Sequence, residues 1–262
     1  AEHGDFYLMC HFRILLFFGF CDILVKKCVK GAFPMSQILP KYYFSGEFAD
    51  FYPMLRSLRG REVRFRAGEF LWKIGEPVTT IFYFRSGLVQ CYVEHEDGHR
   101  KNLSFHGADT VFPGAQRADY KIERSILVRA LTDVEAVAFD REGFYRFCLE
   151  HPTLLAQLYE MQSSYVNMLI YDAAHQRYND TFLKVCNFLF LMAHHGMAGD
   201  GAAGISQEAI ADTLGVGRNH VTKSLSRLRQ EDIVRLGRRR VEIMDLKKLK
   251  DYCSLETLEA PF

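Results

Sequence analysis

Apolar and polar residues follow two different patterns along the chain, and the change from one to the other divides it. From Glu62 to Phe139, short aromatic and β-branched runs are separated by glycines, and Asp97-Gly98 is a strong hairpin signal. Several short strands at this spacing predict a barrel or a sandwich. Residues 41–58, before this segment, and the residues after Arg141 carry apolar side chains at helical spacing instead.

A long apolar stripe follows Arg141, with steps that alternate between four and three residues. That spacing is typical of a coiled-coil seam, so we expect residues 151–178 to form a dimerisation helix. Its predicted dimer interface consists of Leu154, Leu158, Met161, Tyr165 and Met168. The alternative is that the stripe packs on the chain's own barrel, and both can hold for a helix with two apolar faces. Asp172 continues the stripe, where a carboxylate would be costly unless it is paired.

Residues 205–228 predict two helices joined by a tight turn. The hydroxyl of Ser206 can cap the first helix, Gly215 suits the turn, and Val221 and Leu225 repeat at helical spacing on the second helix. The opposite face of the second helix carries side chains that can reach bases and phosphates. They are Arg218, Asn219, Thr222, Lys223 and Ser226, and we add Ser206 as a further candidate DNA contact.

Two short strands are predicted beyond this helix pair, over residues 233–243. They are joined through Gly237 and three consecutive arginines, Arg238, Arg239 and Arg240. Arginines at such a tip suit phosphate contact, which gives affinity independent of base sequence. A solvated hairpin tip is the alternative, but its place beside the second helix favours DNA.

Charge is distributed unevenly along the 262 residues, although the net charge is only +1. Residues 205–250 carry eleven Lys or Arg against six Asp or Glu, and the remainder is therefore mildly acidic. A basic C-terminal module on an acidic body is typical of a nucleic-acid binder with a separate sensing part. The hydrophobic content of 48% is that of a folded protein.

Seven cysteines are scattered without a CxxC pair, which predicts reduced thiols in a cytoplasmic protein. Cys10, Cys21 and Cys28 are spaced too widely and irregularly for an iron–sulfur cluster. Residues 1–34 are interpreted as an N-terminal extension before Met35. The apolar run 12–25 is too short to span a bilayer, which leaves a membrane-associated segment as the alternative.

The run LGVGRNHVTKSLSRL, residues 214–228, resembles the turn and recognition helix of the CRP/FNR family of bacterial transcription regulators. Asn219 stands where that family often has Glu, and Ser224 where a branched apolar residue is usual. The stretch RAGEFLWKIGEPVTTIFYFRSGLVQCYVEHEDGHRKNLSFHGADTVF resembles the cyclic-nucleotide-binding-like β-roll of the same family.

This resemblance implies an α+β fold. It has an N-terminal double-stranded β-helix, which is a jelly-roll-like β-roll, then a long dimerisation helix and a C-terminal winged helix-turn-helix. We expect an effector-sensing β-roll domain over 35–150, the dimerisation helix over 151–178 and the DNA-binding domain over 179–262.

The resemblance also points to an effector site in the roll. Cyclic-AMP-binding members hold the ribose with a Gly-Glu pair and the phosphate with an Arg-Ser pair. Arg124 and Ser125 resemble the second pair, whereas Pro113 and Gly114 stand where the first is expected. The missing Glu argues against cyclic AMP, and the effector remains unknown. An ion pair with a carboxylate is the alternative role for Arg124. The expected effector-binding residues are Phe112, Gly114, Tyr120, Arg124 and Ser125.

His95, His99 and His106 lie on or near the hairpins and suggest haem-binding members of the family. A redox or haem-type gas-sensing regulator is therefore one alternative function, although the histidine spacing fixes no metal geometry and we predict no metal site. A membrane-associated cyclic-nucleotide-binding sensor is another. No nucleophile–base pair indicates an enzyme.

Together these patterns predict a cytoplasmic transcription regulator and no membrane partner. It is expected to bind double-stranded DNA with a palindromic operator as a homodimer, under the control of a small-molecule effector. RNA polymerase is a further candidate partner.

Overall fold

The computed structural model of the protein describes residues 39–72, 75–114, 125–197, 202–203, 205–237 and 240–258. The predicted N-terminal extension, with its apolar run and three cysteines, lies outside the described residues. So do two of the five expected effector-binding residues, Tyr120 and Arg124.

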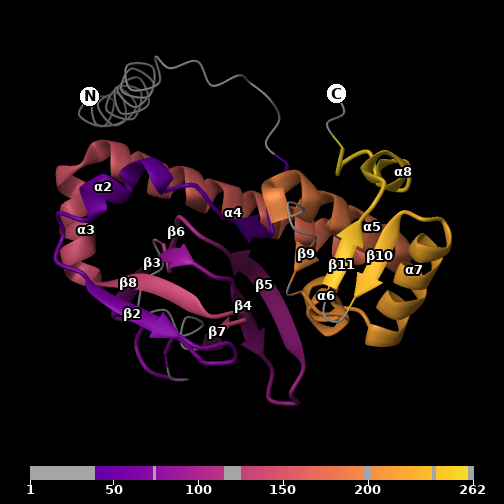
Figure 1. Cartoon of the computed structure of the whole chain (residues 1–262), viewed down its shortest axis with the longest axis horizontal. Helices are drawn as coiled ribbons and strands as arrows, with labels where there is room; N and C mark the ends of the chain where they lie inside the picture. Colours follow the sequence, from indigo (N-terminus) through magenta and orange to yellow (C-terminus); the bar gives the residue numbers. More distant parts are fainter. Residues whose placement is uncertain are drawn as a thin grey trace, which may run out of the picture. The chain divides into compact units, whose positions relative to one another are not determined.

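Eight strands in two four-stranded sheets form the β-roll (Figure 1). One sheet has the order β1-β5-β4-β7 and the other β2-β8-β3-β6. The strands are β1 (Tyr43–Phe44), β2 (Arg61–Phe65), β3 (Thr80–Ser86), β4 (Val89–Glu94), β5 (Arg100–His106), β6 (Thr110–Phe112), β7 (Ile126–Ala130) and β8 (Val134–Asp140). The predicted hairpin at Asp97-Gly98 is confirmed, because it joins the antiparallel pair β4 and β5. Gly98 has a φ of 79°, which suits a residue without a Cβ.

The two sheets enclose an apolar interior to which both contribute. Phe82 and Phe84 of β3 lie there, opposite Val89 and Cys91 of β4 and Val128 of β7. Burial of these side chains supplies the main driving force for closing the roll.

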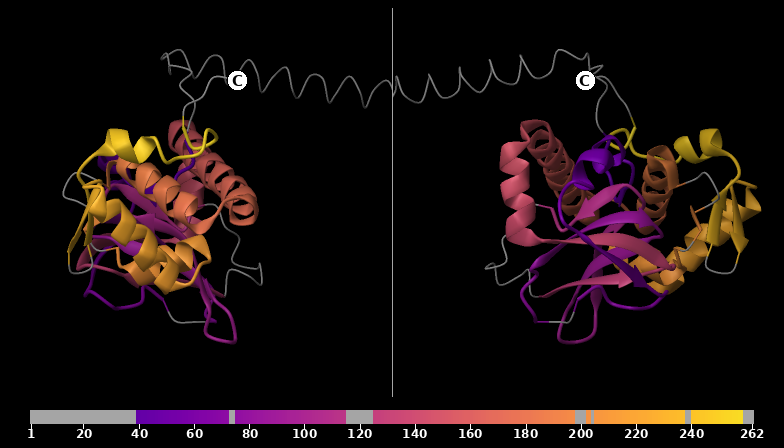
Figure 2. Two further views of the ribbon diagram at one scale, coloured as in Figure 1. Left: turned by 90° about the vertical axis from the view of Figure 1, so that its right-hand side faces the viewer. Right: turned by 60° about the vertical axis from the view of Figure 1, so that its left-hand side comes forward.

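Helices cover the outer face of the second sheet. They are η1 (Ala49–Phe51), α2 (Tyr52–Leu55), α3 (Arg141–Glu150) and α4 (Pro152–Tyr178). Figures 1 and 2 show α3 at one end of the strands and α4 running past the roll. Asp140 begins α3, because its carboxylate accepts a hydrogen bond from the Gly143 N–H at 2.8 Å. The helical pattern predicted for 41–58 is only partly realised. Strand β1 occupies its start, and the chain turns at Gly46, whose φ is 86°.

The C-terminal part contains a helix pair and a small sheet. Its elements are α5 (Thr181–Met192), η3 (Ala193–Met197), β9 (Ala202–Ala203), α6 (Gln207–Leu214), α7 (Arg218–Gln230), β10 (Val234–Gly237), β11 (Arg240–Ile243) and α8 (Leu246–Lys250). The three strands pair in the order β10-β11-β9. Strand β9 was not predicted, since its two alanines lie in a glycine-rich stretch, and such a composition is typical of a loop. Their backbone pairs with Arg240 and Val241.

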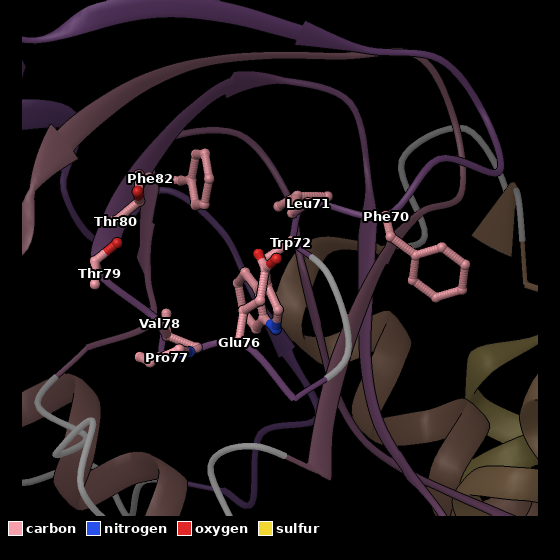
Figure 3. Close-up of a pocket in the computed structure, with 9 residues that line it drawn as sticks. All are labelled: Phe70, Leu71, Trp72, Glu76, Pro77, Val78, Thr79, Thr80 and Phe82. Carbon is pink, nitrogen blue, oxygen red and sulfur yellow. The ribbon is translucent and has the colours of Figure 1, made fainter.

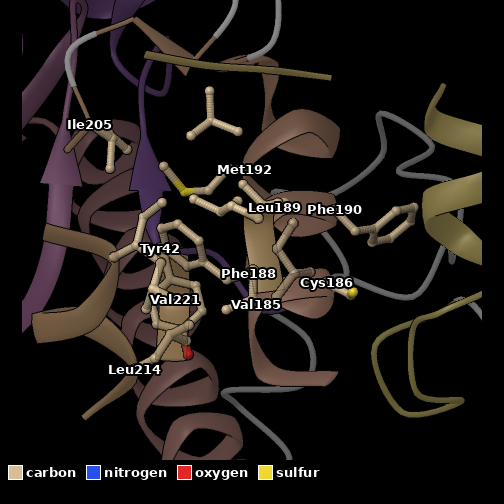
Figure 4. Close-up of a cluster of buried hydrophobic side chains, with 14 of the residues drawn as sticks. Tyr42, Val185, Cys186, Phe188, Leu189, Phe190, Met192, Ile205, Leu214 and Val221 are labelled. Atoms are coloured by element: carbon tan, nitrogen blue, oxygen red, sulfur yellow. The ribbon is translucent and has the colours of Figure 1, made fainter. Parts of the chain in front are cut away.

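One large apolar cluster joins the C-terminal part to the roll (Figure 4). Leu39, Tyr42 and Phe105 on the roll side pack with Met168 of α4 and Leu189 of α5. Residues 39–262 therefore form a single compact unit, in which the three predicted domains share a core. The domain boundaries themselves remain predictions.

Candidate functional site

The first helix of the predicted helix-turn-helix is α6, and it is capped as the sequence indicated. The Ala209 N–H donates to Ser206 Oγ at 3.1 Å, which satisfies one of the unpaired donors at the start of the helix. The helix ends at Gly215 in the left-handed conformation, with a φ of 61°. This turn fixes the angle at which α7 leaves α6.

Helix α7 has one buried face and one exposed face. Its buried residues are Val221, Ser224, Leu225 and Leu228. Ser224, which replaces the usual branched residue, donates its hydroxyl to the His220 carbonyl at 2.9 Å and so buries no unpaired polar group. The exposed residues include Arg218, Asn219, Thr222 and Lys223, and Ser226 is half-buried. The structure thus brings these predicted DNA-binding residues together on one helix.

Two further residues belong to this exposed surface. Gln207 of α6 accepts a hydrogen bond from the Thr222 hydroxyl at 2.8 Å, and His220 is exposed beside Asn219. Sequence reasoning missed both residues. The amide of Gln207 could have marked it as a candidate base-reading group.

The wing is the antiparallel pair β10 and β11, whose paired ends leave a two-residue tip. Arg238 and Arg239, two of the predicted DNA-binding residues, lie outside the described residues. Arg240 is exposed, and its Nη2 lies 3.7 Å from Glu242, which also contacts Arg235 at 3.5 Å. Because these two arginines share a single carboxylate, this part of the wing keeps a net positive charge.

Ser206 faces a different neighbour from the α7 residues. It lines a pocket of about 310 Å³ between α6 and the roll, together with Arg100, Arg129, Glu208 and Asp212. Burial and the nearby Glu208 raise the pKa of Asp212, and Arg100 acts in the opposite direction. Two arginines of the roll therefore lie in one pocket with two carboxylates of the DNA-binding module.

A polar network fixes the end of α6 to strand β5. Asn102 Nδ2 donates to Thr213 Oγ1 at 2.9 Å, and Lys101 Nζ donates to the Thr213 carbonyl at 2.5 Å. Lys101 Nζ also lies 2.7 Å from Asp172 Oδ2, while the Tyr42 hydroxyl donates to Asp172 Oδ1 at 2.8 Å. Burial and the Asp172 carboxylate raise the pKa of Tyr42. We call these five residues the Asp172 network. It supplies the partner that a carboxylate in the α4 stripe needs.

The predicted dimer stripe of α4 packs on the chain's own roll. Leu154, Leu158 and Met161 are buried in the cluster beneath α3 and α4, and Met168 is buried in the cluster shared with α5. Tyr165 is half-buried between the two clusters. Within one chain the roll and α5 already cover the four buried residues, so their assignment to a dimer interface stays a prediction. The alternative, packing on the barrel, is what the structure has.

A second apolar stripe on α4 is exposed instead. It consists of Leu155, Tyr159, Val166 and Ile170, with exposed fractions of 41%, 71%, 52% and 66%. We call it the outer stripe. The steps of four and seven residues keep these side chains on one side of the helix.

The three expected effector-binding residues that the structure describes have different surroundings. Phe112 is buried inside the roll, whereas Ser125 is exposed. Gly114 lies against α4: a Cβ added there would meet Gln162 Nε2 at 2.1 Å and Met161 Cε at 2.7 Å. The place where cyclic-AMP-binding members carry their Glu thus has no carboxylate, and a side chain there would require the ends of Gln162 and Met161 to shift. The described residues here do not fit the ribose of cyclic AMP.

A pocket of about 590 Å³ lies instead beside strand β3 (Figure 3). Its lining includes Phe70, Leu71, Trp72, Glu76, Thr80 and Phe82. The indole of Trp72 lies nearly parallel to the ring of Phe112, at 6.2 Å and 4°, which connects this pocket to the roll interior. Sequence analysis missed Trp72, although it is the only tryptophan of the chain.

The candidate haem-binding histidines lie in two separate places. His95 and His99 belong to the β4–β5 hairpin, and His106 ends β5. His95 contacts Asp97 at 3.2 Å, while His106 packs against Phe44 and Phe112. Since β5 spans roughly 20 Å, the two places cannot share one metal ion. Among the described residues no group of three ligands is suited to a metal.

The remaining sequence expectations concern the thiols and the membrane. Cys91, Cys148, Cys186 and Cys253 form no disulfide bond with one another, and burial raises the pKa of the last three. Within the described ranges, no helix is both long and apolar enough to cross a bilayer.

Comparisons with known proteins agree with this geometry. A model of the Crp-like helix-turn-helix domain matches residues 183–252, and one of the cyclic nucleotide-binding domain matches residues 62–151. The CRP-like cAMP-activated global transcriptional regulator of Mycobacterium tuberculosis is 24% identical over 71% of this chain and 85% of its own length. The cyclic AMP receptor protein of Thermus thermophilus is 25% identical over 76% and 95%. The solved structure of FixK2 from Bradyrhizobium japonicum covers 75% of this chain and 98% of its own, with a TM-score of 0.67 and 20% identity.

Proposed function

The chain belongs to the CRP/FNR family of transcription regulators, and we propose that it acts on a palindromic operator as a homodimer controlled by a small molecule in its roll. Proteins of this family are regulators and not enzymes, so the enzyme alternative is excluded. The helix-turn-helix and the effector-binding type of domain are established by the family matches. The dimer, the operator and the effector are the proposed parts.

The exposed face of α7 carries this proposal. The opposite face of this helix is buried in the core, so its exposed side chains can enter a major groove together. They are Arg218, Asn219, Thr222 and Lys223. The guanidinium of Arg218 suits guanine, and the amide of Asn219 suits adenine. Arg240 and the wing add phosphate contacts beside them.

Dimerisation is assigned to the outer stripe of α4. A continuous apolar surface with heptad-like steps is costly to leave in water, and a second copy of the same helix would cover it. Pairing about a two-fold axis presents two α7 helices to half-sites about 34 Å apart. Such a dimer, once bound to DNA, could also contact RNA polymerase.

Effector control is supported by contacts between the roll and α4. Gly114 abuts Met161 and Gln162, and the Thr110 hydroxyl lies 4.0 Å from the Met161 sulfur. A ligand that repacks the roll interior would therefore press on α4. The Asp172 network joins the same helix to α6, so a shift of α4 would reach the DNA-binding module.

The DNA-reading role is tested with Arg218→Ala. We expect a loss of affinity of about 5- to 160-fold for an operator selected from random duplexes, because a bidentate contact to one base contributes about 1–3 kcal/mol. Preference at the contacted base pair should relax as well. Fluorescence anisotropy with operator and point-mutated duplexes measures both quantities.

Arg64→Ala is the matched control, since Arg64 is a surface arginine of β2 that pairs with Glu135. It removes the same charge from the roll and should leave operator affinity unchanged. An Arg218→Ala protein with an unaltered sequence preference would contradict the assignment of α7 as the reading helix.

A further inference from the structure

The pocket between α6 and the roll lies over the outer face of the sheet β1-β5-β4-β7. Gln90 of β4 and Arg129 of β7 are register partners, so their side chains lie on the same face of that sheet. Their neighbours Val89, Cys91 and Val128 fill the roll interior. Because side chains alternate along a strand, Gln90 and Arg129 point outward and line the pocket. Figure 1 shows α6 beside this sheet.

Two nearly buried polar groups on this face of the sheet have no partner. The exposed fractions of Gln90 and Tyr92 are only 8% and 3%, and both residues line the pocket. Among the described residues, neither the Gln90 amide nor the Tyr92 hydroxyl has a hydrogen-bond partner. Leaving such groups unsatisfied is unfavourable at a nearly buried position. A ligand with polar groups of its own would satisfy them.

The two walls of the pocket carry opposite charges. Arg129 uses its Nε–H for a backbone carbonyl at 3.2 Å, and in the described part of the chain its Nη groups have no partner. Arg100 is already paired with Glu94 at 2.6 Å. On the α6 side, Glu208 and Asp212 form no ion pair with any residue that the structure describes. Burial and Glu208 raise the pKa of the half-buried Asp212 despite the opposing effect of Arg100.

A ligand with a single charge would match only one wall. An anion would suit Arg129 but lie close to two carboxylates, whereas a cation would suit the carboxylates and leave Arg129 unpaired. A zwitterion provides a partner for both walls. The volume of about 310 Å³ is at the lower end of small-molecule sites, which fits a ligand of amino-acid size.

We propose that this pocket binds a small polar amino acid as a zwitterion. The carboxylate of the ligand accepts hydrogen bonds from Arg129, and its ammonium group donates to Asp212 beside Glu208. Its polar side chain pairs with the Gln90 amide and the Tyr92 hydroxyl. A ligand held in this way joins the roll to the DNA-binding module. The site is separate from the roll interior, and its occupancy does not depend on the proposed control of DNA binding.

Isothermal titration calorimetry of the full-length protein with four compounds tests the ligand class. They are L-asparagine, L-leucine, N-acetyl-L-asparagine and L-asparaginamide. Leucine has the shape of asparagine with an apolar side chain, the acetylated compound keeps only the negative charge, and the amide keeps only the positive charge. We expect asparagine to bind most tightly and each of the other three to bind at least about threefold more weakly, as expected for the loss of one exposed contact.

Two charge variants assign the ends of the ligand. Arg129→Gln should weaken asparagine and N-acetylasparagine about fivefold and leave asparaginamide unchanged, because Arg129 is exposed. Asp212→Asn should weaken asparagine and asparaginamide about tenfold and leave N-acetylasparagine no weaker, because Asp212 is half-buried. Arg64→Gln and Asp97→Asn remove the same charges from exposed positions elsewhere on the roll and should change none of these affinities.

A third variant tests the polar groups of the sheet. Gln90→Leu removes the amide while nearly keeping the size of the side chain, and it should reduce the preference for asparagine over leucine about threefold. Circular dichroism and thermal unfolding establish that each variant is folded.

Several results would overturn the proposal. Absence of binding heat with asparagine at millimolar concentration, or tighter binding of either singly charged analogue, overturns the ligand class. Equal affinity for asparagine and leucine overturns the role of Gln90 and Tyr92. A folded Arg129→Gln or Asp212→Asn protein that binds all four compounds like the wild type overturns the contact assigned to that residue.

Discussion

The two apolar stripes of α4 have similar composition and spacing but opposite surroundings. The inner stripe, which includes Leu154, Leu158 and Met161, is buried against the roll of its own chain. The outer stripe, which includes Tyr159 and Val166, is exposed. Periodicity therefore indicates that a helix has an apolar face, but it does not indicate whether the partner is the same chain or a second one.

The largest expected effect follows from truncating the inner stripe. Leu158→Ala should lower the free energy of unfolding by about 3 kcal/mol, because it removes a buried side chain and leaves a cavity. Tyr159→Ala, one residue away on the outer stripe, should change the stability of the monomer by less than about 0.5 kcal/mol. Urea unfolding at low protein concentration measures both.

A different result would reverse the comparison. If Leu158→Ala dissociated the dimer without lowering the stability of the monomer, the inner stripe would be the dimer seam after all.

The second effect concerns association. Val166→Glu should raise the dissociation constant of the dimer on the order of a hundredfold, since two carboxylates would be buried face to face near its axis. Thr153→Glu places the same charge on another exposed side of α4 and is the control. Sedimentation velocity over a dilution series gives the dissociation constant, and an unchanged value for Val166→Glu would exclude the outer stripe as the interface.

The smallest expected effect is a loss of stability at acidic pH that comes from the buried His106. Burial, with a contribution from the charge of Lys41, lowers the pKa of His106 from 6.5 to about 3. Below pH 6.5 the unfolded chain binds a proton that the folded chain resists, so stability present at neutral pH is lost as the pH falls toward 3. His106 should account for about 2 kcal/mol of loss between pH 7 and pH 5.

His106→Phe keeps a ring against Phe44 and Phe112 and should flatten this part of the pH profile. His95→Ala removes an exposed imidazole and should not. Equal slopes for wild type and His106→Phe between pH 5 and pH 7 would show that the group does not resist protonation.

Local signals explain why much of the fold was predictable. The Ser206 cap, the left-handed Gly215 and the hairpin at Gly98 each depend on a few neighbouring residues, so their elements could be placed from sequence. The exposed residues of α7 followed from the same local pattern.

The remaining features depend on residues far apart in the chain. Sequence analysis indicated that the Asp172 carboxylate would be costly to bury without a partner. Its partners Tyr42 and Lys101 come from other elements, so the pattern of α4 does not predict them. The effector residues were assigned by resemblance and not by packing, which is why Trp72 was missed and Gly114 turned out to abut α4.

The Asp172 network has a consequence for the construction of chimeric regulators. Its residues come from the start of the roll, strand β5, helix α4 and helix α6, so no single cut in the chain separates a complete roll from a complete DNA-binding module. A hybrid that joins this roll, at the end of α4, to the DNA-binding module of another protein would leave Lys101 and Asn102 without the hydrogen-bond partner that Thr213 provides. Such a graft should therefore exchange residues 101, 102 and 213 as one set, so that the contact between β5 and α6 is kept.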